Sequence, residues 1–564
     1  MNEPFYWVNE RTEKFLDRGY LSPGETAQSR VRDIADKAES ILGIPGFSDK
    51  FYDYMGKGWY SLSSPVWSNY GKSRGLGVSC FGSDVSDSVP GILRAGSEIG
   101  AMSKAGGGTA VSMGKVRPRG SAINNNGTST GAVHFLELFQ AITDVISQGS
   151  TRRGRTAAYL PIDHGDIEEF LKIGTEGNPI QSMNTAVTIS DQWMNDMLEG
   201  NTSYRKVWGN MLKQRSEVGY PYILFTDNVN NKTVDVYKDK GMRINHSQLC
   251  SEILLPTTSE ESFVCVLSSM NLLHYDEWKD TDAVETLVYF LDSVVSEFIT
   301  DLETFRDSDD PDDKETFHLL KRAYTFAVKH RALGVGSLGW HSLLQSKMLP
   351  FEGRDAAKLN LEIAKVIKDK SYKASKELAT LLGEPSVLKG YGRRNTTLNA
   401  IAPTTSSAFI LGQVSQSIEP YFSNYYIKDL AKAKVVVKNK YLEALLDSKG
   451  LNDKSVWDVI AASDGSVYGL SDDILTPEEK AVFKTFREID QNAIIAQAST
   501  RGEYIDQGQS LNLMITSDLS PKEISELHIT AWRQGIKTLY YQHSVNQSQQ
   551  FAMNKNQSCE ACEG

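Results

Sequence analysis

Cysteine is scarce in this chain, with five residues among 564. Such scarcity argues against a disulfide-stabilised scaffold of the secreted type. Three cysteines lie in the interior of the sequence, Cys80, Cys250 and Cys265, and each on its own is typical of a small buried hydrophobic side chain. The other two, Cys559 and Cys562, form a Cys-x-x-Cys motif at the end of the chain, where packing in a core is not plausible. This pair therefore needs an explanation other than packing.

Long apolar runs, a signal sequence and a basic charge balance are absent as well. No stretch approaches the roughly 18 apolar residues that a membrane helix needs. The polar residues 1–20 lack the apolar core of a secretory signal peptide. With 60 Lys and Arg against 71 Asp and Glu, the net charge of −11 argues against a general nucleic-acid-binding protein, although a few local cations suffice for a nucleotide phosphate. We expect a cytoplasmic protein that binds neither membranes nor nucleic acid.

Clustered histidines are missing too. The nine histidines are scattered, and none forms a His-x-x-x-His pair with nearby carboxylates. Structural zinc needs four ligands, and the histidine nearest to Cys559 is His543, which stands 16 residues upstream. We predict that this chain itself binds no metal.

Helices and short apolar strands alternate along the chain, without repeats or interior linkers. Apolar residues at helical spacing predict helices over 25–42, 132–148, 283–304 and 356–382, and apolar runs predict strands over 156–161 and 263–267. A Ser520-Pro-Lys-Glu capping box predicts a helix that stops near Gly535, followed by a strand-like run over 536–541. This alternation is typical of an α/β architecture in one continuous body. The last twenty or so residues, rich in Gln, Asn and Ser, predict a mobile tail.

Two features indicate redox or radical chemistry. The Cys559–Cys562 pair on a mobile tail suits thiol–disulfide exchange, which needs accessible thiols, and implies a buried partner disulfide elsewhere in the chain. Two of the three interior cysteines could form that partner. Cys250 stands two residues before Glu252, so that in an extended loop both side chains would emerge on one side. A thiol beside a base is a plausible catalytic couple, although this motif alone is weak.

Six separate segments of the chain share a known pattern. They are Ser79-Cys80, Leu249-Cys-Ser-Glu252, Cys265-Val-Leu-Ser-Ser-Met-Asn-Leu, Pro403-Thr-Thr-Ser-Ser407, Lys537-Thr-Leu-Tyr-Tyr541-Gln and the Cys559/Cys562 tail. In content and order they resemble the large subunit of class I ribonucleotide reductase, from about residue 60 to the end. All five cysteines fall on functional cysteine positions of that family.

The resemblance implies a fold. It is a ten-stranded α/β barrel made of two five-stranded halves, with Cys250 on a finger loop through its centre. The expected organisation is a helical N-terminal segment over 1–60, the catalytic barrel over 61–545 and a flexible redox-active tail over 546–564.

The resemblance also assigns roles to the cysteines. Cys250 would become a thiyl radical that takes the 3′-hydrogen of the substrate ribose, and Glu252 would be the base on the 3′-hydroxyl. Cys80 and Cys265 would supply the reducing equivalents and end as a disulfide. Cys559 and Cys562 would reduce that disulfide and be reduced in turn by thioredoxin or glutaredoxin.

One position departs from the family pattern. Two residues before the radical cysteine the family usually has asparagine, which hydrogen-bonds the substrate hydroxyls, whereas this chain has Gln248. Glutamine keeps the amide chemistry on a side chain that is one methylene longer. We expect Gln248 to serve in that place with a shifted backbone, unless another residue takes the role.

Tyr540 and Tyr541 resemble the stacked pair that passes the radical from a partner subunit to Cys250. An isolated Tyr-Tyr pair would more simply be two strand residues on opposite faces, because side chains alternate along a strand. Stacking of two neighbours requires an irregular local backbone.

Two nucleotide sites are implied. Substrate phosphate would bind at Pro403, Thr404, Thr405, Ser406 and Ser407, helped by Ser64 and Ser79, because small hydroxyl residues at a helix start form an anion site. Asp84, Ser88, Arg117, Arg119 and Arg152 resemble the positions that bind a nucleoside triphosphate effector and connect it to the substrate base. Without the resemblance, the first cluster is equally typical of a turn, and the arginines of a solvated loop.

The family further implies a homodimer and a small subunit that generates the radical at its own metal site. Ribonucleoside diphosphates would be the substrates. Many relatives carry an N-terminal domain for ATP or dATP that switches overall activity, and the resemblance leaves no room for it before residue 60. We therefore expect that dATP does not inhibit this enzyme through a second site.

Three other functions compete with this interpretation. A class II, adenosylcobalamin-dependent reductase shares the barrel and the cysteines, but it needs no tyrosine relay. A non-catalytic nucleotide-binding homologue would not need to keep every redox cysteine together with Glu252. A plain disulfide oxidoreductase would not need the Leu-Cys-Ser-Glu loop.

Overall fold

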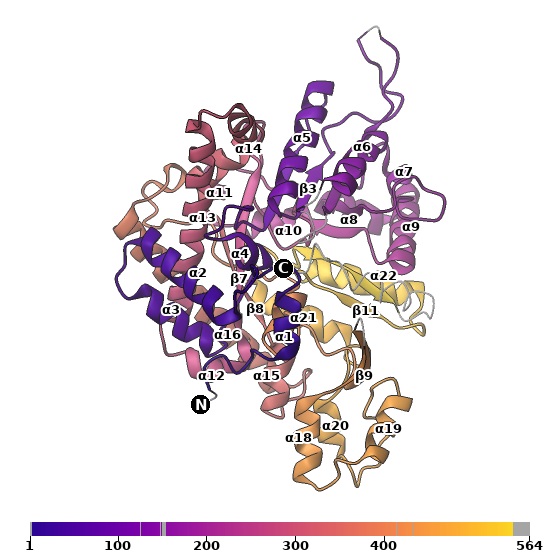
Figure 1. Cartoon of the computed structure of the whole chain (residues 1–564). Helices are drawn as coiled ribbons and strands as arrows, with labels where there is room; N and C mark the ends of the chain where they lie inside the picture. The colour runs from indigo at the N-terminus through magenta and orange to yellow at the C-terminus, as the bar shows by residue number, and fades with distance from the viewer. Residues whose placement is uncertain are drawn as a thin grey trace.

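The computed structural model of the chain describes residues 3–124, 126–146, 148, 154–412, 414–430 and 433–544. Arg152, Cys559, Cys562 and the predicted tail over 546–564 lie outside the described residues. The N-terminal helices are α1 (Glu10–Leu16), α2 (Ala27–Leu42) and α3 (Phe47–Gly56); α2 and α3 pack together against α13 (Ala283–Asp307) on the left flank, whereas α1 lies apart from them and contacts α17 (Thr405–Ile410) (Figure 1). Thr26 and Ser29 form a capping box at the start of α2, which confirms the helix predicted over 25–42.

The first half of the barrel is a parallel sheet in which strands and helices alternate. Its strands, in spatial order, are β2 (Cys80–Asp84), β3 (Thr109–Ser112), β4 (Thr156–Pro161), β5 (Asn184–Ile189) and β6 (Tyr222–Phe225). The helices along this half are α5 (Val89–Ala105), α6 (Ala132–Val145), α7 (Ile167–Phe170), α8 (Asp191–Glu199), α9 (Thr202–Val218), α10 (Thr226–Asn231) and α11 (Asp235–Asp239). Nearly every residue of the five strands is buried, as expected for parallel strands covered on both faces.

The second half completes the ring. β7 (Phe263–Asn271) runs antiparallel to β2 and parallel to β8 (Leu333–Leu338). The short segments 398–401 and 508–511 follow, joined by the parallel bridges Val335↔Asn399 and Ile401↔Gln509. β12 (Thr538–Leu539) pairs antiparallel with β6, and the N–H of the next residue, Tyr540, donates to the Leu511 carbonyl at 2.9 Å. Five segments in each half therefore confirm the predicted ten-stranded barrel.

The remaining elements surround or extend the barrel. The strands are β1 (Tyr60–Leu62), which pairs with the far end of β7, the hairpin β9 (Tyr425–Leu430) and β10 (Ala433–Lys438), and the pair β11 (Leu513–Ile515) and β13 (Gln542–Ser544). The helices are α4 (Ser64–Asn69), α12 (Tyr275–Trp278), α13 (Ala283–Asp307), α14 (Pro311–His330), α15 (Trp340–Ser346), α16 (Arg354–Leu382), α17 (Thr405–Ile410), α18 (Lys440–Ser448), α19 (Lys454–Ala462), α20 (Pro477–Val482), α21 (Gln491–Gly502) and α22 (Pro521–Arg533), with 3₁₀ turns η1 (Leu272–His274) and η2 (Ser386–Leu388). Both long helices predicted over 283–304 and 356–382 are confirmed, as is the capping box before α22.

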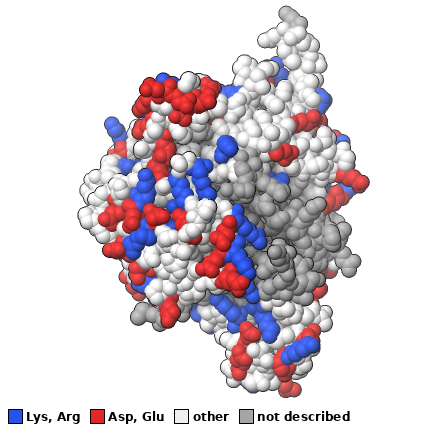
Figure 2. All heavy atoms as spheres, in the orientation of Figure 1, with Lys and Arg blue, Asp and Glu red and all other residues white. Residues whose placement is uncertain are grey.

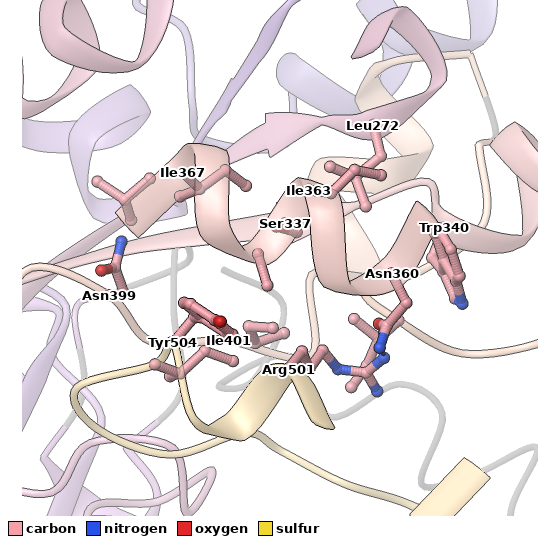
Figure 3. Close-up of a pocket in the computed structure, with 14 residues that line it drawn as sticks. Leu272, Ser337, Trp340, Asn360, Ile363, Ile367, Asn399, Ile401, Arg501 and Tyr504 are labelled. Carbon is pink, nitrogen blue, oxygen red and sulfur yellow. Dashed lines mark hydrogen bonds between the residues drawn. The ribbon is translucent and has the colours of Figure 1, made fainter. Parts of the chain in front are cut away.

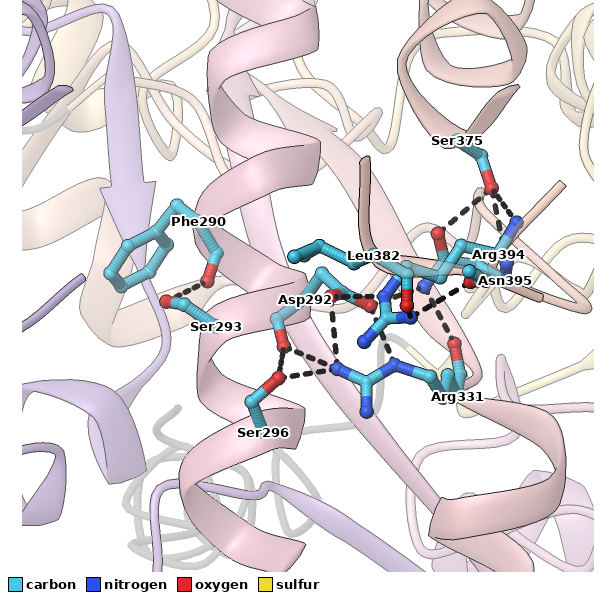
Figure 4. Close-up of polar contacts among 10 residues, drawn as sticks. Phe290, Asp292, Ser293, Ser296, Arg331, Ser375, Leu382, Arg394 and Asn395 are labelled. Atoms are coloured by element: carbon cyan, nitrogen blue, oxygen red, sulfur yellow. Dashed lines mark hydrogen bonds and ion pairs between the residues drawn. The ribbon is translucent and has the colours of Figure 1, made fainter. Parts of the chain in front are cut away.

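A buried ion cluster fixes helix α13 to the second half of the barrel. Asp292 accepts from Arg331 Nε at 2.9 Å, from Arg394 Nε at 2.8 Å and from Asn395 Nδ2 at 2.9 Å (Figure 4). Burial alone would raise the pKa of this carboxyl group, but the two guanidinium groups outweigh burial and lower it. Asp292 is therefore a buried charge with its partners in place, and it ties α13 to the segments on either side of β8.

One part of the chain has a hydrophobic core of its own. Ten buried residues between 442 and 483, on α18–α20 and the turns between them, form a cluster separate from the main core. Figure 1 shows these helices projecting from the bottom of the molecule. The helices of this lobe have the same amphipathic pattern as those of the barrel, so the sequence alone does not distinguish the lobe from the main body.

The helices and the surface show neither a membrane span in the described ranges nor a single-sign charge pattern on the face drawn in Figure 2. None of the helices in the described ranges is long and apolar enough to cross a bilayer. On the face shown in Figure 2, basic and acidic side chains are interspersed, and acidic side chains gather at the upper left.

Candidate active site

The interior of the barrel is crossed by the loop 243–262, which joins α11 to β7 and contains Cys250. On one side, the Tyr159 hydroxyl of β4 donates to the Gln248 carbonyl at 2.7 Å. On the other side, Gly508 N donates to the Glu252 carbonyl at 2.8 Å, and Leu254 N donates to Gln507 Oε1 at 3.0 Å. Because β4 and the segment 507–508 belong to different halves, the loop spans the barrel. This confirms the predicted finger loop.

Cys80 and Cys265 face each other across the antiparallel pair β2–β7, where they are direct Cα partners. Antiparallel partners lie about 4.5–5.5 Å apart at Cα, which is within the range that a disulfide can bridge. None of the three described cysteines forms a disulfide. Burial raises the pKa of Cys265 to about 12, against a smaller lowering by the Gln507 amide. The geometry thus holds a reduced pair that needs little movement to close.

Gln248 connects the finger loop to this pair. Its Oε1 accepts from Cys250 N at 2.9 Å, and its Nε2 lies 3.7 Å from Cys80 Sγ. Its main-chain carbonyl is held by Tyr159. The Gln248 amide group therefore lies between Cys80 and the backbone of Cys250.

Glu252 follows Cys250 after a left-handed turn at Ser251, whose φ is 69°. The Ser510 hydroxyl lies 2.6 Å from the Cys250 carbonyl oxygen and 2.9 Å from Glu252 Oε2, so it shares its single hydrogen between these two acceptors. Burial raises the pKa of Glu252 to about 7, although donors from Gln248 and Ser510 oppose the shift. A carboxyl group with this pKa can both take and return a proton at neutral pH.

Tyr540 and Tyr541 lie where the predicted strand over 536–541 is interrupted, between β12 and β13. Their ring centroids are 4.5 Å apart with an interplanar angle of 62°. The irregular backbone was expected, but the rings meet edge to face instead of stacking in parallel. The ring of Tyr222 on β6 packs against both, with centroid distances of 4.6 Å to Tyr540 and 5.1 Å to Tyr541. Asn184 Nδ2 donates to the hydroxyls of both Tyr222 and Tyr541 at 2.8 Å.

The predicted phosphate residues lie at the start of α17. Thr404 has a left-handed φ of 54°, and its hydroxyl accepts from Ser417 N at 2.7 Å. Ser406 Oγ is buried and has no hydrogen-bond partner within the described part of the chain. Pro403 precedes this turn and Thr405 is the first residue of α17, so its backbone N–H is one of those left without an intrahelical partner.

A second helix start, at α4, lies beside the first. Ser61 Oγ donates to the Ser407 carbonyl at 3.1 Å, which joins α17 to the strand before α4. Ser64 is the first residue of α4, and Ser79 Oγ donates to Ser63 Oγ at 3.0 Å. The structure therefore brings Ser64 and Ser79 to the same region as the segment 403–407.

The predicted effector residues divide into two groups. Asp84 ends β2, where it is paired with Lys115 at 2.9 Å, and Ser88 caps α5 by accepting from Gly91 N at 3.2 Å. Arg117 is paired with Asp87 at 2.7 Å and therefore lies in the same region. Arg119 instead points to Glu169 of α7 at 2.8 Å. The structure brings Asp84, Ser88 and Arg117 together, but not Arg119.

Several residues at the site were not identified from the sequence. They are Tyr159, Asn184, Tyr222, Gln507 and Ser510, all of which hold the finger loop or the tyrosines. The polar run Gln507-Gly-Gln-Ser510 between apolar Ile505 and Leu511 was a usable signal, because buried polar groups require partners. The tyrosines and Asn184 gave no signal, because each is ordinary in a strand.

A small cavity elsewhere is distinct from this site. It has a volume of about 30 Å³ and lies outside the barrel between β8, α16 and α21 (Figure 3). Its lining is mostly apolar and includes the buried Arg501, which donates to Asn360 Oδ1 at 2.7 Å and to Gln509 Oε1 at 2.6 Å. A space of this size holds about one or two waters.

Comparisons with known proteins agree with this geometry. A family model described as "Ribonucleotide reductase, barrel domain" matches residues 78–204, 197–387 and 385–542. The chain is 35% identical over 549 residues to the "Putative ribonucleoside-diphosphate reductase large subunit" of Frog virus 3, with 93% of each chain covered. It is 29% identical to the large subunit of Arabidopsis thaliana, covering 94% of this chain and 75% of that one.

A solved structure is similar over the whole chain. It is the "Actinobacillus ureae class Id ribonucleotide reductase alpha subunit", with 50% sequence identity and a TM-score of 0.89. The match covers 97% of this chain and 99% of the other.

Proposed function

This chain belongs to the ribonucleotide reductase large-subunit family, and we propose that it reduces ribonucleoside diphosphates to 2′-deoxyribonucleoside diphosphates by thiyl-radical chemistry. The observation that carries the proposal is the arrangement of three thiols inside the barrel. Cys80 and Cys265 are direct strand partners, and the Gln248 amide joins Cys80 to Cys250. A radical thiol, a base and a reducing dithiol are thereby gathered in one buried space.

The proposed reaction balances with these groups. The Cys250 thiyl radical takes the 3′-hydrogen, so that the C–H bond breaks and an S–H bond forms, while Glu252 accepts the 3′-hydroxyl proton. The 2′-hydroxyl leaves as water with a proton from one thiol of the pair, and the hydrogen of the other thiol goes to C2′. Cys80 and Cys265 thereby supply two electrons and become a disulfide. Glu252 returns its proton to the 3′-oxygen, and Cys250 returns its hydrogen to C3′ and is again a thiyl radical. Per turnover, one ribonucleotide and two thiols give one deoxyribonucleotide, one disulfide and one water.

The radical would come from a separate, metal-containing small subunit through Tyr541 and Tyr540. Contact between the two rings at 4.5 Å supports a relay, because electron transfer between phenols requires proximity. The similarity of this chain to the alpha subunit of a class Id ribonucleotide reductase favours a small subunit over adenosylcobalamin as the source of the radical. Thioredoxin or glutaredoxin would regenerate the enzyme through Cys559 and Cys562, which lie outside the described residues.

A homodimer regulated by nucleoside triphosphates completes the proposal. Exposed apolar side chains lie along α5 and α6, two helices that pack together: Val89 at the start of α5 is 63% exposed, Leu93 is 54% exposed, and Val145 at the end of α6 is 82% exposed. Such a face is typical of a protein–protein contact. Of the proposed effector residues, Asp84 ends β2 and Ser88 caps α5, so the dimer contact and part of the effector site would share one helix.

Product analysis with CDP tests the proposal. Wild-type protein with its small subunit, a dithiol reductant and a triphosphate effector should form dCDP. Cys250→Ser should form none, while it still binds the effector, because serine keeps the shape of the site and cannot carry the thiyl radical. Formation of dCDP by Cys250→Ser at the wild-type rate would contradict the proposed chemistry.

A further inference from the structure

The peptide bond between Tyr540 and Tyr541 is held by side chains instead of by a neighbouring strand. Arg215 Nη1 donates to the Tyr540 carbonyl at 3.1 Å. Asn512 Oδ1 accepts from Tyr541 N at 3.0 Å. These are the two polar groups of one peptide unit, and it lies at the interruption between β12 and β13. On either side the regular pattern continues, since Tyr540 N donates to Leu511 O and Leu513 N donates to Tyr541 O.

A regular strand could not present the two tyrosines together. Successive strand residues point to opposite faces, whereas here both rings contact each other and Tyr222. Bringing the two rings together turns the Tyr540–Tyr541 peptide away from the hydrogen bonds between neighbouring strands. Its buried N–H and C=O groups then require other partners. Arg215 and Asn512 meet that requirement.

Arg215 is anchored as well as buried. Its Nε donates to His528 Nε2 at 3.3 Å, and its Nη1 also donates to the Pro221 carbonyl. His528 Nδ1 lies 2.7 Å from the Ile524 carbonyl, so Nδ1 carries the hydrogen and Nε2 is the acceptor. Arg215 has no carboxylate partner in the described part of the chain, and burial lowers its pKa to about 9. Two carbonyl groups and an imidazole accept its hydrogen bonds, whereas Nη2 is buried without a partner among the described residues.

Asn512 is anchored on the opposite side. Its Nδ2 donates to Glu419 Oε1 at 2.5 Å, and Glu419 is itself buried. Burial raises the pKa of Glu419 to about 8, although the amide of Asn512 opposes the shift. Among the described residues, Asn512 Nδ2 is the one hydrogen-bond partner of the Glu419 carboxyl group that the structure records, so Glu419 mainly orients Asn512.

We propose that Arg215 and Asn512 form a side-chain clamp on the Tyr540–Tyr541 peptide that positions the tyrosine pair for radical transfer. This inference rests on the proposed function and adds two positioning residues to it. Neither contacts the interior cysteines through a recorded bond, so removing either should slow radical transfer and leave nucleotide binding intact. The clamp acts on the relay through backbone geometry.

The test compares variants of the full chain assayed with the small subunit. Arg215→Met keeps the volume of the side chain but leaves the Tyr540 carbonyl without its donor. Asn512→Ala removes the acceptor of Tyr541 N. Each variant should lower kcat for CDP reduction by about 10- to 100-fold, as expected when reacting groups are misplaced by about 1 Å, and change KM by less than about twofold. Arg215→Lys should recover part of kcat, because the ammonium group still donates.

Arg501→Met is the matched control. Arg501 is also buried, has no carboxylate partner among the described residues, and has its pKa lowered to about 9, but it bonds Asn360 and Gln509 and no residue of the tyrosine pair (Figure 3). It should lose thermal stability as Arg215→Met does while keeping most of kcat. An equal loss of kcat in Arg501→Met would overturn the clamp, as would wild-type kcat in folded Arg215→Met or Asn512→Ala. If Arg215→Met does not fold, the kcat of Asn512→Ala alone tests the proposed clamp. An inactive wild-type holoenzyme would instead refute the proposed function.

Discussion

Glu252 takes its chemical character from its surroundings and not from its neighbours in the sequence. It is buried in the barrel, and burial raises its pKa to about 7. The same carboxyl group on the surface would be fully ionised at that pH and a weaker proton carrier. The sequence placed Glu252 beside Cys250, but only the barrel makes it a base matched to neutral pH.

Glu252→Gln should lower kcat for CDP reduction by about 10²- to 10⁴-fold, because the amide cannot accept the 3′-hydroxyl proton. KM should change little, since the side chain keeps its size and polarity. The measurement is steady-state kinetics with the small subunit present. Activity within twofold of the wild type would remove Glu252 from the mechanism.

The pH dependence of stability offers a second test on the same residue. Because the folded-state pKa is raised, from 4.5 to about 7, folding favours the protonated carboxyl group. This contribution to the free energy of unfolding is fully present below about pH 4.5. It is lost as the pH rises through 7, and the loss is on the order of 3 kcal/mol. The Glu252→Gln variant lacks this pH-dependent contribution, so its stability should rise relative to that of the wild type between pH 5 and 8. Unfolding by denaturant at several pH values measures this, and a constant difference would contradict the assignment.

At the scale of elements, the finger loop is held by the strands that surround it. Tyr159 supports it from one half of the barrel, and Gln507, Gly508 and Ser510 support it from the other. Loops are usually the least ordered elements, but this one is buried around Cys250, and the carbonyl groups of Gln248, Cys250 and Glu252 accept hydrogen bonds. Cys250, the proposed radical cysteine, is thereby held by hydrogen bonds that come from distant parts of the sequence.

Ser510→Ala should weaken both the fold and the reaction. It leaves the Cys250 carbonyl without its donor, which costs about 1–3 kcal/mol of unfolding free energy. It also removes a donor that lowers the pKa of Glu252, so the acidic limb of the kcat profile should move to higher pH. Ser499→Ala is the control, because Ser499 is half-buried and its hydroxyl donates to Gln534 O at 2.6 Å outside the site. An unchanged pH profile of kcat in Ser510→Ala would show that Ser510 does not affect the pKa of Glu252.

The elements differ in how far the sequence predicts them. Helices α2 and α22 were predictable, because each combines a capping box with apolar residues at helical spacing. The segments 398–401 and 508–511 were not, because their pairing is limited to isolated bridges and single hydrogen bonds, and Gly508 bonds the finger loop. The cysteine roles came from the resemblance. The distances around the cysteines, the edge-to-face contact of the two tyrosine rings and the proposed clamp depend on tertiary contacts, which the sequence does not reveal.

At the scale of the whole molecule, the apolar face of α5 and α6 accounts for the proposed dimer. Leu93→Glu should convert the dimer into a monomer, because it places a charge in the middle of that face. Light scattering after size exclusion, with effector present, measures the mass. Val459→Glu on α19, where the native side chain is 39% exposed, is the control and should leave the mass unchanged. A dimeric Leu93→Glu protein would place the contact elsewhere.

We propose that this chain reduces ribonucleotides with a radical delivered through Tyr540 and Tyr541. The most direct test is CDP reduction with a dithiol in three parallel reactions: the chain alone, the chain with its small subunit, and the chain with adenosylcobalamin. We predict dCDP only with the small subunit, and none there for Tyr541→Phe. Turnover with adenosylcobalamin alone would contradict this proposal and would mean that both tyrosines serve only in packing.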